Sequence, residues 1–179
     1  MTIIGVDPDE HLTAPAAAAE LPSLPMPFDE FFTRHHTQLV RALSLALGDV
    51  EFGRDAAAEG FARALERWSV VSTYVNPSGW VYRVGLNWAR SGRRRLRRER
   101  LGMRLADGPA ADVAPRDAAL VAALGQLSIE HRTVVVGRYY LDWSEAELAD
   151  ALDVAPGTVK SRLSRALTRL ATLLEEPHG

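Results

Sequence analysis

Residues 143–170, WSEAELADALDVAPGTVKSRLSRALTRL, carry the strongest structural signal in the chain. Ser144 and Glu147 form a capping box, which is typical of the first turn of a helix. The turn that follows, DVA at 153–155, has the length found in a helix-turn-helix, and Pro156 suits the first position of a second helix because its missing N–H costs nothing there. The stretch therefore predicts a helix-turn-helix of the kind that docks on DNA.

The second helix of this pair has an apolar face and a polar face. The apolar side chains recur at helical spacing and are expected to face the core: Val159, Leu163, Ala166, Leu167 and Leu170. The polar face holds small polar groups and hydrogen-bond donors suited to phosphates and to base edges in the major groove: Thr158, Lys160, Ser161, Ser164 and Arg165. We interpret this face as a DNA-binding surface, the alternative being an ordinary amphipathic hairpin.

Charge is distributed unevenly along the chain, although the formal net charge is only −2. Nine arginines and one acid give residues 83–104 a net charge of +8, whereas residues 1–82 and 105–179 carry −6 and −4. A basic block of this kind favours nucleic-acid binding, the alternative being a solvated run of like charges. Trp80 and Trp88 interleave with the block, and aromatic rings beside a cationic groove can stack unpaired bases.

Composition excludes several classes of protein. The 179 residues include no cysteine, which rules out a disulfide framework and favours a reducing cytoplasm. Apolar runs are too short to span a membrane. His35 and His36 are adjacent, which is poor spacing for two metal ligands on one helix face, and we find no phosphate loop or nucleophile–base arrangement. We therefore expect no enzyme activity, no catalytic residue, no metal, no cofactor and no small-molecule substrate.

Periodicity predicts an all-α fold. Asp29 is expected to cap the first helix, Phe61, Leu65 and Trp68 to face inward from the second, and residues 69–78 to form a loop. The expected helices lie near residues 29–47, 54–68, 78–98, 116–126 and 129–141, followed by the two helices of the helix-turn-helix.

The same pattern predicts two small helical domains joined by a flexible linker. The segments rich in Ala, Pro, Gly and Asp lack helical periodicity and separate or precede the helical parts. The expected divisions are a disordered extension at 1–27, a helical domain at 28–104, a linker at 105–117 and the helix-turn-helix domain at 118–174.

With these residues in view, the chain resembles bacterial RNA polymerase sigma factors of the extracytoplasmic-function class, also called group 4. The most specific match is PGTVKSRLSRA at 156–166, which follows the recognition helix of the family. DAAAEGF at 55–61 resembles the segment that grips the polymerase clamp, and WVYRVGLN at 80–87 resembles the segment that opens and reads the −10 element. The resemblance covers residues 28–104, as sigma region 2, and 118–174, as sigma region 4.

The resemblance implies that the chain binds core RNA polymerase and promoter DNA, with an anti-sigma factor as a candidate third partner, and leaves RNA synthesis to the polymerase. The residues implied at the core polymerase are Asp55, Glu59 and Arg63. Those implied at the −10 element are Tyr74, Asn76, Trp80, Arg83, Asn87, Arg90, Arg93, Arg94 and Arg95. Those implied at the −35 element are Thr158, Lys160, Ser161, Ser164 and Arg165.

Several positions depart from the family pattern. Ala58 stands where the clamp-binding segment commonly has Gln, and Ser91 stands where Asp is usual. Gly137 replaces a usual Leu within a helix, which costs about 1 kcal/mol of helix propensity before any lost packing. Ala155 stands where the recognition helix usually has a Ser or Thr cap, and Ser164 is smaller than the residue often found there.

Two other functions are compatible with the residues. One is a stand-alone helix-turn-helix transcriptional regulator that binds DNA as a dimer, although the sequence shows no sensor domain and no separate dimerisation helix. The other is a protein-interaction module whose basic helix binds an acidic partner.

Overall fold

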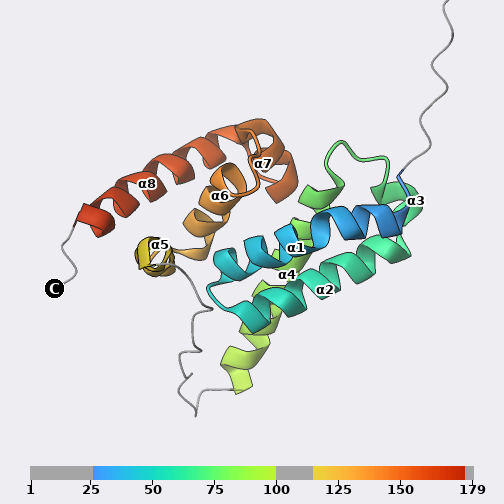
Figure 1. Cartoon of the computed structure of the whole chain (residues 1–179), viewed down its shortest axis with the longest axis horizontal. Helices are drawn as coiled ribbons and strands as arrows, with labels where there is room; N and C mark the ends of the chain where they lie inside the picture. The colour runs from blue at the N-terminus through green and yellow to red at the C-terminus, as the bar shows by residue number, and fades with distance from the viewer. Residues whose placement is uncertain (1–25, 100–114, 176–179) are drawn as a thin grey trace, which may run out of the picture.

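The computed structural model describes residues 26–99 and 115–175, and every regular element in these two ranges is an α-helix (Figure 1). The predicted all-α class is thereby confirmed. None of the described helices combines the length and apolar character needed to cross a membrane. The helices are α1 Phe28–Leu47, α2 Val50–Glu66, α3 Trp68–Val71, α4 Pro77–Glu99, α5 Pro115–Gly125, α6 Ile129–Tyr139, α7 Glu145–Leu152 and α8 Pro156–Glu175.

A tight junction separates α1 from α2. Gly48 ends α1 in the left-handed conformation, at φ 72°, and its N–H donates to the Ser44 carbonyl at 2.8 Å. Asp49 then caps α2, because its carboxylate accepts from the Phe52 N–H at 2.9 Å. This cap starts α2 at Val50, earlier than the predicted residue 54.

Close approach of α2 and α4 depends on two glycines. A Cβ on Gly60 would lie 2.7 Å from the Val81 carbonyl oxygen, and one on Gly85 would lie 2.7 Å from the Ala56 carbonyl oxygen. Because a backbone oxygen cannot move aside like the end of a side chain, both positions require glycine. The two helices pack backbone to backbone there, and α1 covers both of them.

The start of α1 and the segment after α2 differ from the sequence prediction. Pro27, and not Asp29, occupies the cap position of α1. Part of the predicted loop 69–78 belongs to the short helix α3, whose Trp68 donates its indole N–H to the Met26 carbonyl at 2.9 Å. Leu65 is 57% exposed and does not face inward, because none of the described helices covers that side of α2.

The helix-turn-helix forms as predicted. Both hydrogen bonds of the capping box between Ser144 and Glu147 are present at the start of α7. Asp153 ends α7 in the left-handed conformation, and α8 begins at Pro156. The buried residues of α8 follow one stripe at alternating spacings of four and three: Val159, Leu163, Ala166, Leu170 and Leu173.

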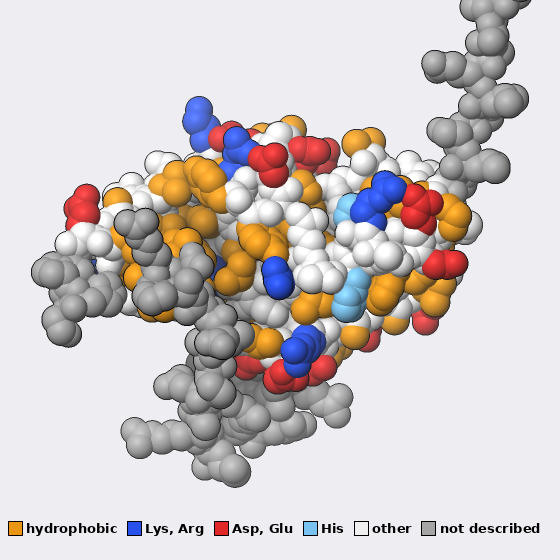
Figure 2. Space-filling view, in the orientation of Figure 1, with side chains coloured by type: hydrophobic (Ala, Val, Ile, Leu, Met, Phe, Trp, Pro, Cys, Tyr) orange, Lys and Arg blue, Asp and Glu red, His pale blue; other side chains and the backbone are white. Residues whose placement is uncertain are grey.

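Leu167, predicted to face the core, is instead 40% exposed. It lies beside the buried stripe of α8, at the edge of the face that the other described helices cover. Figure 2 shows hydrophobic side chains gathered on the side of the molecule where α5 and α8 lie. The exposed large hydrophobic residues of these two helices are Leu120, Leu167 and Leu174.

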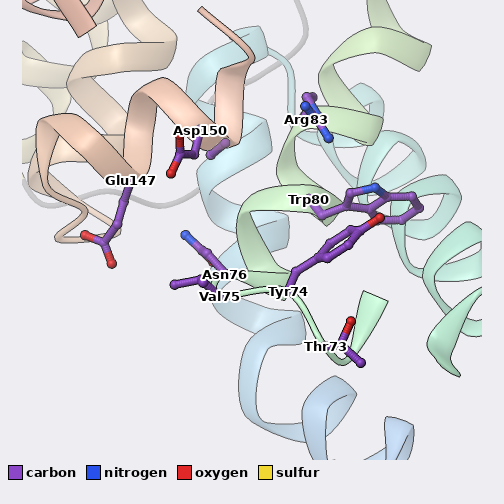
Figure 3. A pocket seen from close by; sticks show the side chains of 9 residues that line it. Thr73, Tyr74, Val75, Asn76, Trp80, Arg83, Glu147 and Asp150 are labelled. Carbon is purple, nitrogen blue, oxygen red and sulfur yellow. The ribbon is translucent and has the colours of Figure 1, made fainter. Parts of the chain in front are cut away.

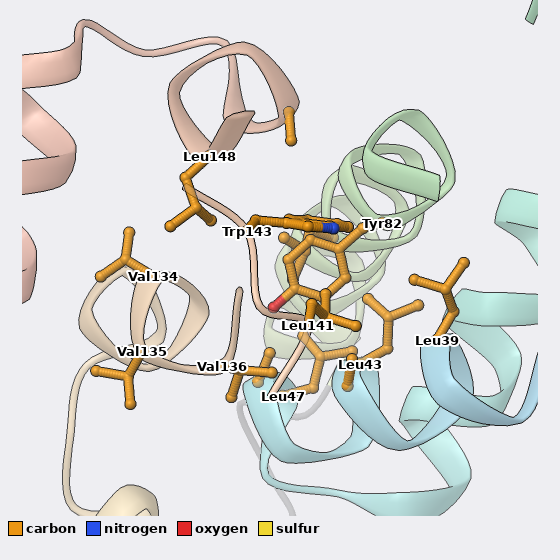
Figure 4. Close-up of a cluster of buried hydrophobic side chains, with 14 of the residues drawn as sticks. Leu39, Leu43, Leu47, Tyr82, Val134, Val135, Val136, Leu141, Trp143 and Leu148 are labelled. Carbon is orange, nitrogen blue, oxygen red and sulfur yellow. The ribbon is translucent and has the colours of Figure 1, made fainter. Parts of the chain in front are cut away.

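The helices before and after residue 100 share one buried core (Figure 4). Tyr82 of α4 is fully buried, and its ring meets the edge of Trp143 at 5.5 Å between centroids. The Tyr82 hydroxyl donates to the Thr133 carbonyl of α6 at 3.4 Å. The buried guanidinium of Arg132 lies against Gly48, where a cation is favourable beside the C-terminal end of α1. Hence α6 packs on α1, and α7 packs on α4.

The domain boundaries stay predictions. Most of the expected extension 1–27 and of the expected linker 105–117 lies outside the described residues.

Candidate nucleic-acid interface

The first turns of α8 present the polar face that the sequence predicts. Lys160, Ser164 and Arg165 are exposed, while Thr158 and Ser161 are half-buried. The Ser161 hydroxyl donates to the Thr158 carbonyl at 3.0 Å, which satisfies part of its hydrogen-bonding capacity within the helix. The exposed side chains lie on a different face of α8 from the buried Val159 and Leu163. Because these two residues pack in the core, the polar face points to solvent.

Arg162 is a cation on α8 that the sequence analysis did not select. It is half-buried, and together with Arg90 of α4 it acts on Glu130 of α6. The pKa of the Glu130 carboxyl is lowered chiefly by a hydrogen bond from its own backbone N–H, with smaller contributions from these two arginines. The sequence spacing gives no sign of this arrangement, because the three residues come from three helices.

The N-terminus of α8 lacks a side-chain cap. Ala155 precedes Pro156, and its carbonyl accepts from the Thr158 N–H at 2.8 Å, but its methyl group accepts nothing. Ala155→Ser places a hydroxyl where it can accept a hydrogen bond from that N–H. We expect the free energy of unfolding to rise by about 0.5–1 kcal/mol. Chemical denaturation of the two proteins measures this, and an unchanged or lower midpoint would show that residue 155 does not have cap geometry.

The predicted −10 residues Tyr74, Asn76, Trp80 and Arg83 meet in one cavity of about 440 Å³ (Figure 3). They come from the α3–α4 loop and the first two turns of α4. The remaining lining residues are Thr73 and Val75 of the same loop and Glu147, Asp150 and Ala151 of α7.

Asn76 has two roles in this cavity. Its side-chain oxygen caps α4, accepting from the Gly79 N–H at 2.7 Å and from the Ser78 hydroxyl at 2.8 Å. Its amide nitrogen is buried and has no hydrogen-bond partner within the part of the chain that the structure describes. A buried donor of this kind is costly unless a ligand or water satisfies it. The cap thus fixes the orientation of the Asn76 side chain, a residue that also lines the cavity.

Further along α4, Arg83, Asn87 and Arg90 follow one another at spacings of four and three, which places them on one face of the helix. Asn87 is exposed, and both arginines are half-buried. The backbone of α4 continues through residues 93–95, but the side chains of Arg93, Arg94 and Arg95 lie outside the described residues.

The predicted polymerase-binding residues lie along the outer side of α2. Asp55 and Arg63 are exposed and Glu59 is half-buried. Arg63 and Glu59 form an ion pair at 2.6 Å, one turn apart, which orients both side chains along the helix. Ala58, where the family commonly has Gln, is exposed directly before Glu59.

Glu147 and Asp150 are charged residues that line the same cavity as Tyr74 and Trp80 and that the sequence did not indicate. Their sequence positions mark them as solvent-facing residues of the first helix of the helix-turn-helix. Only the packing of α7 on α4 brings them beside Asn76 and Trp80.

Comparison with known proteins identifies the family. Residues 117–170 match the family Sigma-70, region 4. ECF RNA polymerase sigma factor SigL of Mycobacterium tuberculosis H37Rv is 35% identical over 170 residues, covering 90% of this chain and 94% of the relative. SigM, an ECF RNA polymerase sigma factor of the Erdman strain, is 32% identical over 168 residues, covering 92% of this chain and 86% of the relative.

The fold is also that of solved sigma factors. The sigma factor RpoE from Bartonella quintana, crystallised with the anti-sigma factor NepR, superposes with a TM-score of 0.67 at 23% identity. The superposition covers 83% of this chain and 99% of that one. These matches favour a sigma factor over a stand-alone regulator, and the chain belongs to the extracytoplasmic-function RNA polymerase sigma factors, which are transcription initiation factors.

Proposed function

We propose that this sigma factor binds core RNA polymerase through the outer side of α2, engages the −10 element at the cavity before α4, and engages the −35 element with α8. The observation that carries the proposal is the cavity itself, which is lined by the rings of Tyr74 and Trp80, by Asn76 and by Arg83. Aromatic faces, a fixed donor and a cation together suit an unpaired base and its phosphate.

The −35 assignment rests on the exposed face of α8. Lys160 and Arg165 supply cations for phosphates or guanine edges, and Ser161 and Ser164 supply small donors. Thr158 lies in the first turn of α8, where the partial positive charge of the helix N-terminus favours a phosphate.

Along α4, Arg83, Asn87, Arg90 and the run Arg93–Arg95 extend the −10 surface as a track for the DNA strand and the duplex beside it. In this proposal residues 28–104 act as sigma region 2 and residues 118–174 as sigma region 4. The protein contributes binding and strand separation in the cytoplasm, while the polymerase performs all the chemistry.

An anti-sigma factor is a further proposed partner. The crystallised Bartonella neighbour was captured with one, which gives a precedent for a chain of this fold. The exposed hydrophobic residues of α5 and α8 offer such a partner apolar contact area.

Co-elution with core RNA polymerase on a sizing column tests the proposed function. We expect the native chain to co-elute and Asp55→Arg to bind at least tenfold more weakly, because a reversed charge at an interface faces groups selected for the opposite sign. Asp55 is exposed, so its replacement leaves the core intact.

The matched control is Glu175→Arg, which makes the same charge change at the exposed end of α8, away from α2. The control should co-elute like the native chain. Equal binding by the native chain and Asp55→Arg would contradict the assignment of α2 as the polymerase-binding surface. Failure of the native chain to co-elute would contradict the proposed function.

A further inference from the structure

Helix α8 carries a second stripe of side chains beside the one that packs in the core. We call it the outer seam. Its residues are spaced alternately by four and three, like those of the buried stripe, and all of them are exposed: Lys160, Ser164, Leu167, Ala171 and Leu174. The last three are apolar, and the two leucines are 40% and 47% exposed. Side chains at this spacing form the seam along which two helices pack. The C-terminal half of α8 therefore offers a packing surface that none of the described helices covers.

The hydroxyl groups beside the outer seam are already hydrogen-bonded within α8. The Thr168 hydroxyl donates to the Ser164 carbonyl at 3.0 Å, and the Thr172 hydroxyl donates to the Thr168 carbonyl at 3.2 Å. A hydroxyl with an internal partner costs less free energy to remove from water than one without. The two threonines thus border the seam without opposing its burial.

The outer seam is complementary to a second copy of itself. If two α8 helices pair antiparallel, Leu167 of each copy lies opposite Ala171 of the other, and Leu174 lies opposite Ser164. Each layer then sets a large side chain against a small one, which lets the two helices interdigitate. Both copies contribute the same residues, as in most homodimers.

Charge along α8 favours the same antiparallel pairing. The cations Lys160, Arg162 and Arg165 lie in its first half, and Glu175 ends it. In the register above, Glu175 of one copy is level with Leu163 of the other and about 3 Å along the axis from Arg165, at 1.5 Å per residue. A parallel pair would instead place like charges side by side. Opposed helix dipoles also favour the antiparallel arrangement.

We infer that the free protein self-associates as an antiparallel dimer through the outer seam of α8. A contact made by one pair of helices buries less than about 1,200 Å² in total, the size class of weak and transient complexes. The dimer therefore forms at micromolar protein concentrations and separates on dilution.

Dimerisation would withhold part of α8 from DNA. In the antiparallel register Leu174 of one copy covers Ser164 of the other, and Ser164 belongs to the face proposed for the −35 element. The dimer and −35 DNA then compete for α8. This consequence rests on the proposed function of α8, whereas the dimer itself does not.

Sedimentation equilibrium of the full chain, over about 1–500 µM, tests the dimer. We expect the mass of the native chain to rise from monomer toward dimer with concentration. Leu167→Glu, which buries a charge in the middle of the seam, should weaken association at least tenfold. The matched control is Leu65→Glu, the same replacement at an exposed leucine of α2, which should associate like the native chain.

Three results would overturn the inference. A native chain that stays monomeric would leave the outer seam to a different partner, such as an anti-sigma factor. Equal association of the native chain and Leu167→Glu, or an equal loss in Leu167→Glu and Leu65→Glu, would show that α8 does not form the contact.

Cysteine crosslinking tests the register, and the absence of native cysteine makes it specific. In the antiparallel pair the two Thr168 residues lie on the same side and within about 3 Å of each other along the axis. A short bifunctional maleimide should therefore join Thr168→Cys into a dimer at least fivefold more efficiently than Arg169→Cys. Arg169 is also exposed, but it lies on the opposite side of the helix from the seam. Similar crosslinking of the two variants would overturn the proposed pairing.

The same crosslink separates the dimer from the proposed DNA contact. A duplex carrying the −35 element should reduce crosslinking of Thr168→Cys at least threefold. Crosslinking that the duplex leaves unchanged would contradict the −35 role of α8 and leave the dimer in place.

Discussion

Tyr82→Ala is expected to lower the free energy of unfolding by about 3–5 kcal/mol, the range for removing a large buried aromatic ring. Tyr82 is fully buried, and its ring makes an edge contact with Trp143 at an interplanar angle of 84°. It lies where α4 meets the C-terminal helices, so the resulting cavity would weaken both sides of the shared core at once. Urea unfolding followed by circular dichroism measures the change.

Tyr82→Phe is the matched control, since it keeps the ring and removes only the hydroxyl. The hydroxyl bond to the Thr133 carbonyl is long, at 3.4 Å, so a loss near the lower end of the usual range of about 0.5–1.5 kcal/mol is expected. A loss below about 1 kcal/mol for Tyr82→Ala would show that the ring does not hold the two groups of helices together.

The same pair of proteins gives a pH signature. Burial raises the pKa of the Tyr82 hydroxyl above its ordinary value, so the folded state retains a proton that the unfolded state releases. The stabilisation from this group is fully present below the ordinary tyrosine pKa of about 10 and is lost as the pH rises beyond it. Tyr82→Phe should therefore lose less stability than the native chain between neutral pH and pH values above about 10.

Local signals in the sequence predict most of the helices. The capping box at Ser144 and Glu147, Ser128 before α6 and Gly48 after α1 each act within one turn, so residue types alone identify them. The start of α2 lies earlier than the predicted residue 54 because the Asp49 carboxylate caps this helix, and apolar periodicity alone does not locate a cap.

Burial at the edge of a helix is not a local property. Leu65 and Leu167 have helical spacing consistent with a core position, but whether a neighbouring helix covers them depends on the packing of the whole chain. The same reason explains the candidate site. Tyr74, Asn76, Trp80 and Arg83 are close in sequence and could be grouped from it, whereas the approach of Glu147 and Asp150 required the tertiary contact between α4 and α7.

Gly137 shows how packing can reverse an expectation based on helix propensity. A glycine within α6 costs about 1 kcal/mol of helix propensity, and the family usually has Leu there, so the sequence suggests a site with missing packing. In the structure, however, a Cβ on Gly137 would clash with the end of the fully buried Leu148 side chain and would lie 3.6 Å from Cε3 of Trp143. Leu148 of α7 already fills the volume that a side chain at 137 would need.

Gly137→Leu is therefore expected to destabilise the protein. Overpacking by a whole side chain at a buried site costs about 3 kcal/mol, and the gain in helix propensity returns about 1 kcal/mol, which leaves a net loss of about 2 kcal/mol.

Leu148→Ala alone should cost about 2–5 kcal/mol, because it leaves a cavity between α6 and α7. In the double variant the leucine side chain introduced at position 137 occupies that cavity, so the two losses should not add. Denaturant unfolding of all four proteins gives the coupling energy, which we expect to favour the double variant by at least about 2 kcal/mol. Additive losses, or a Gly137→Leu protein more stable than the native chain, would mean that Leu148 moves aside and that the crossing of α6 and α7 does not require glycine.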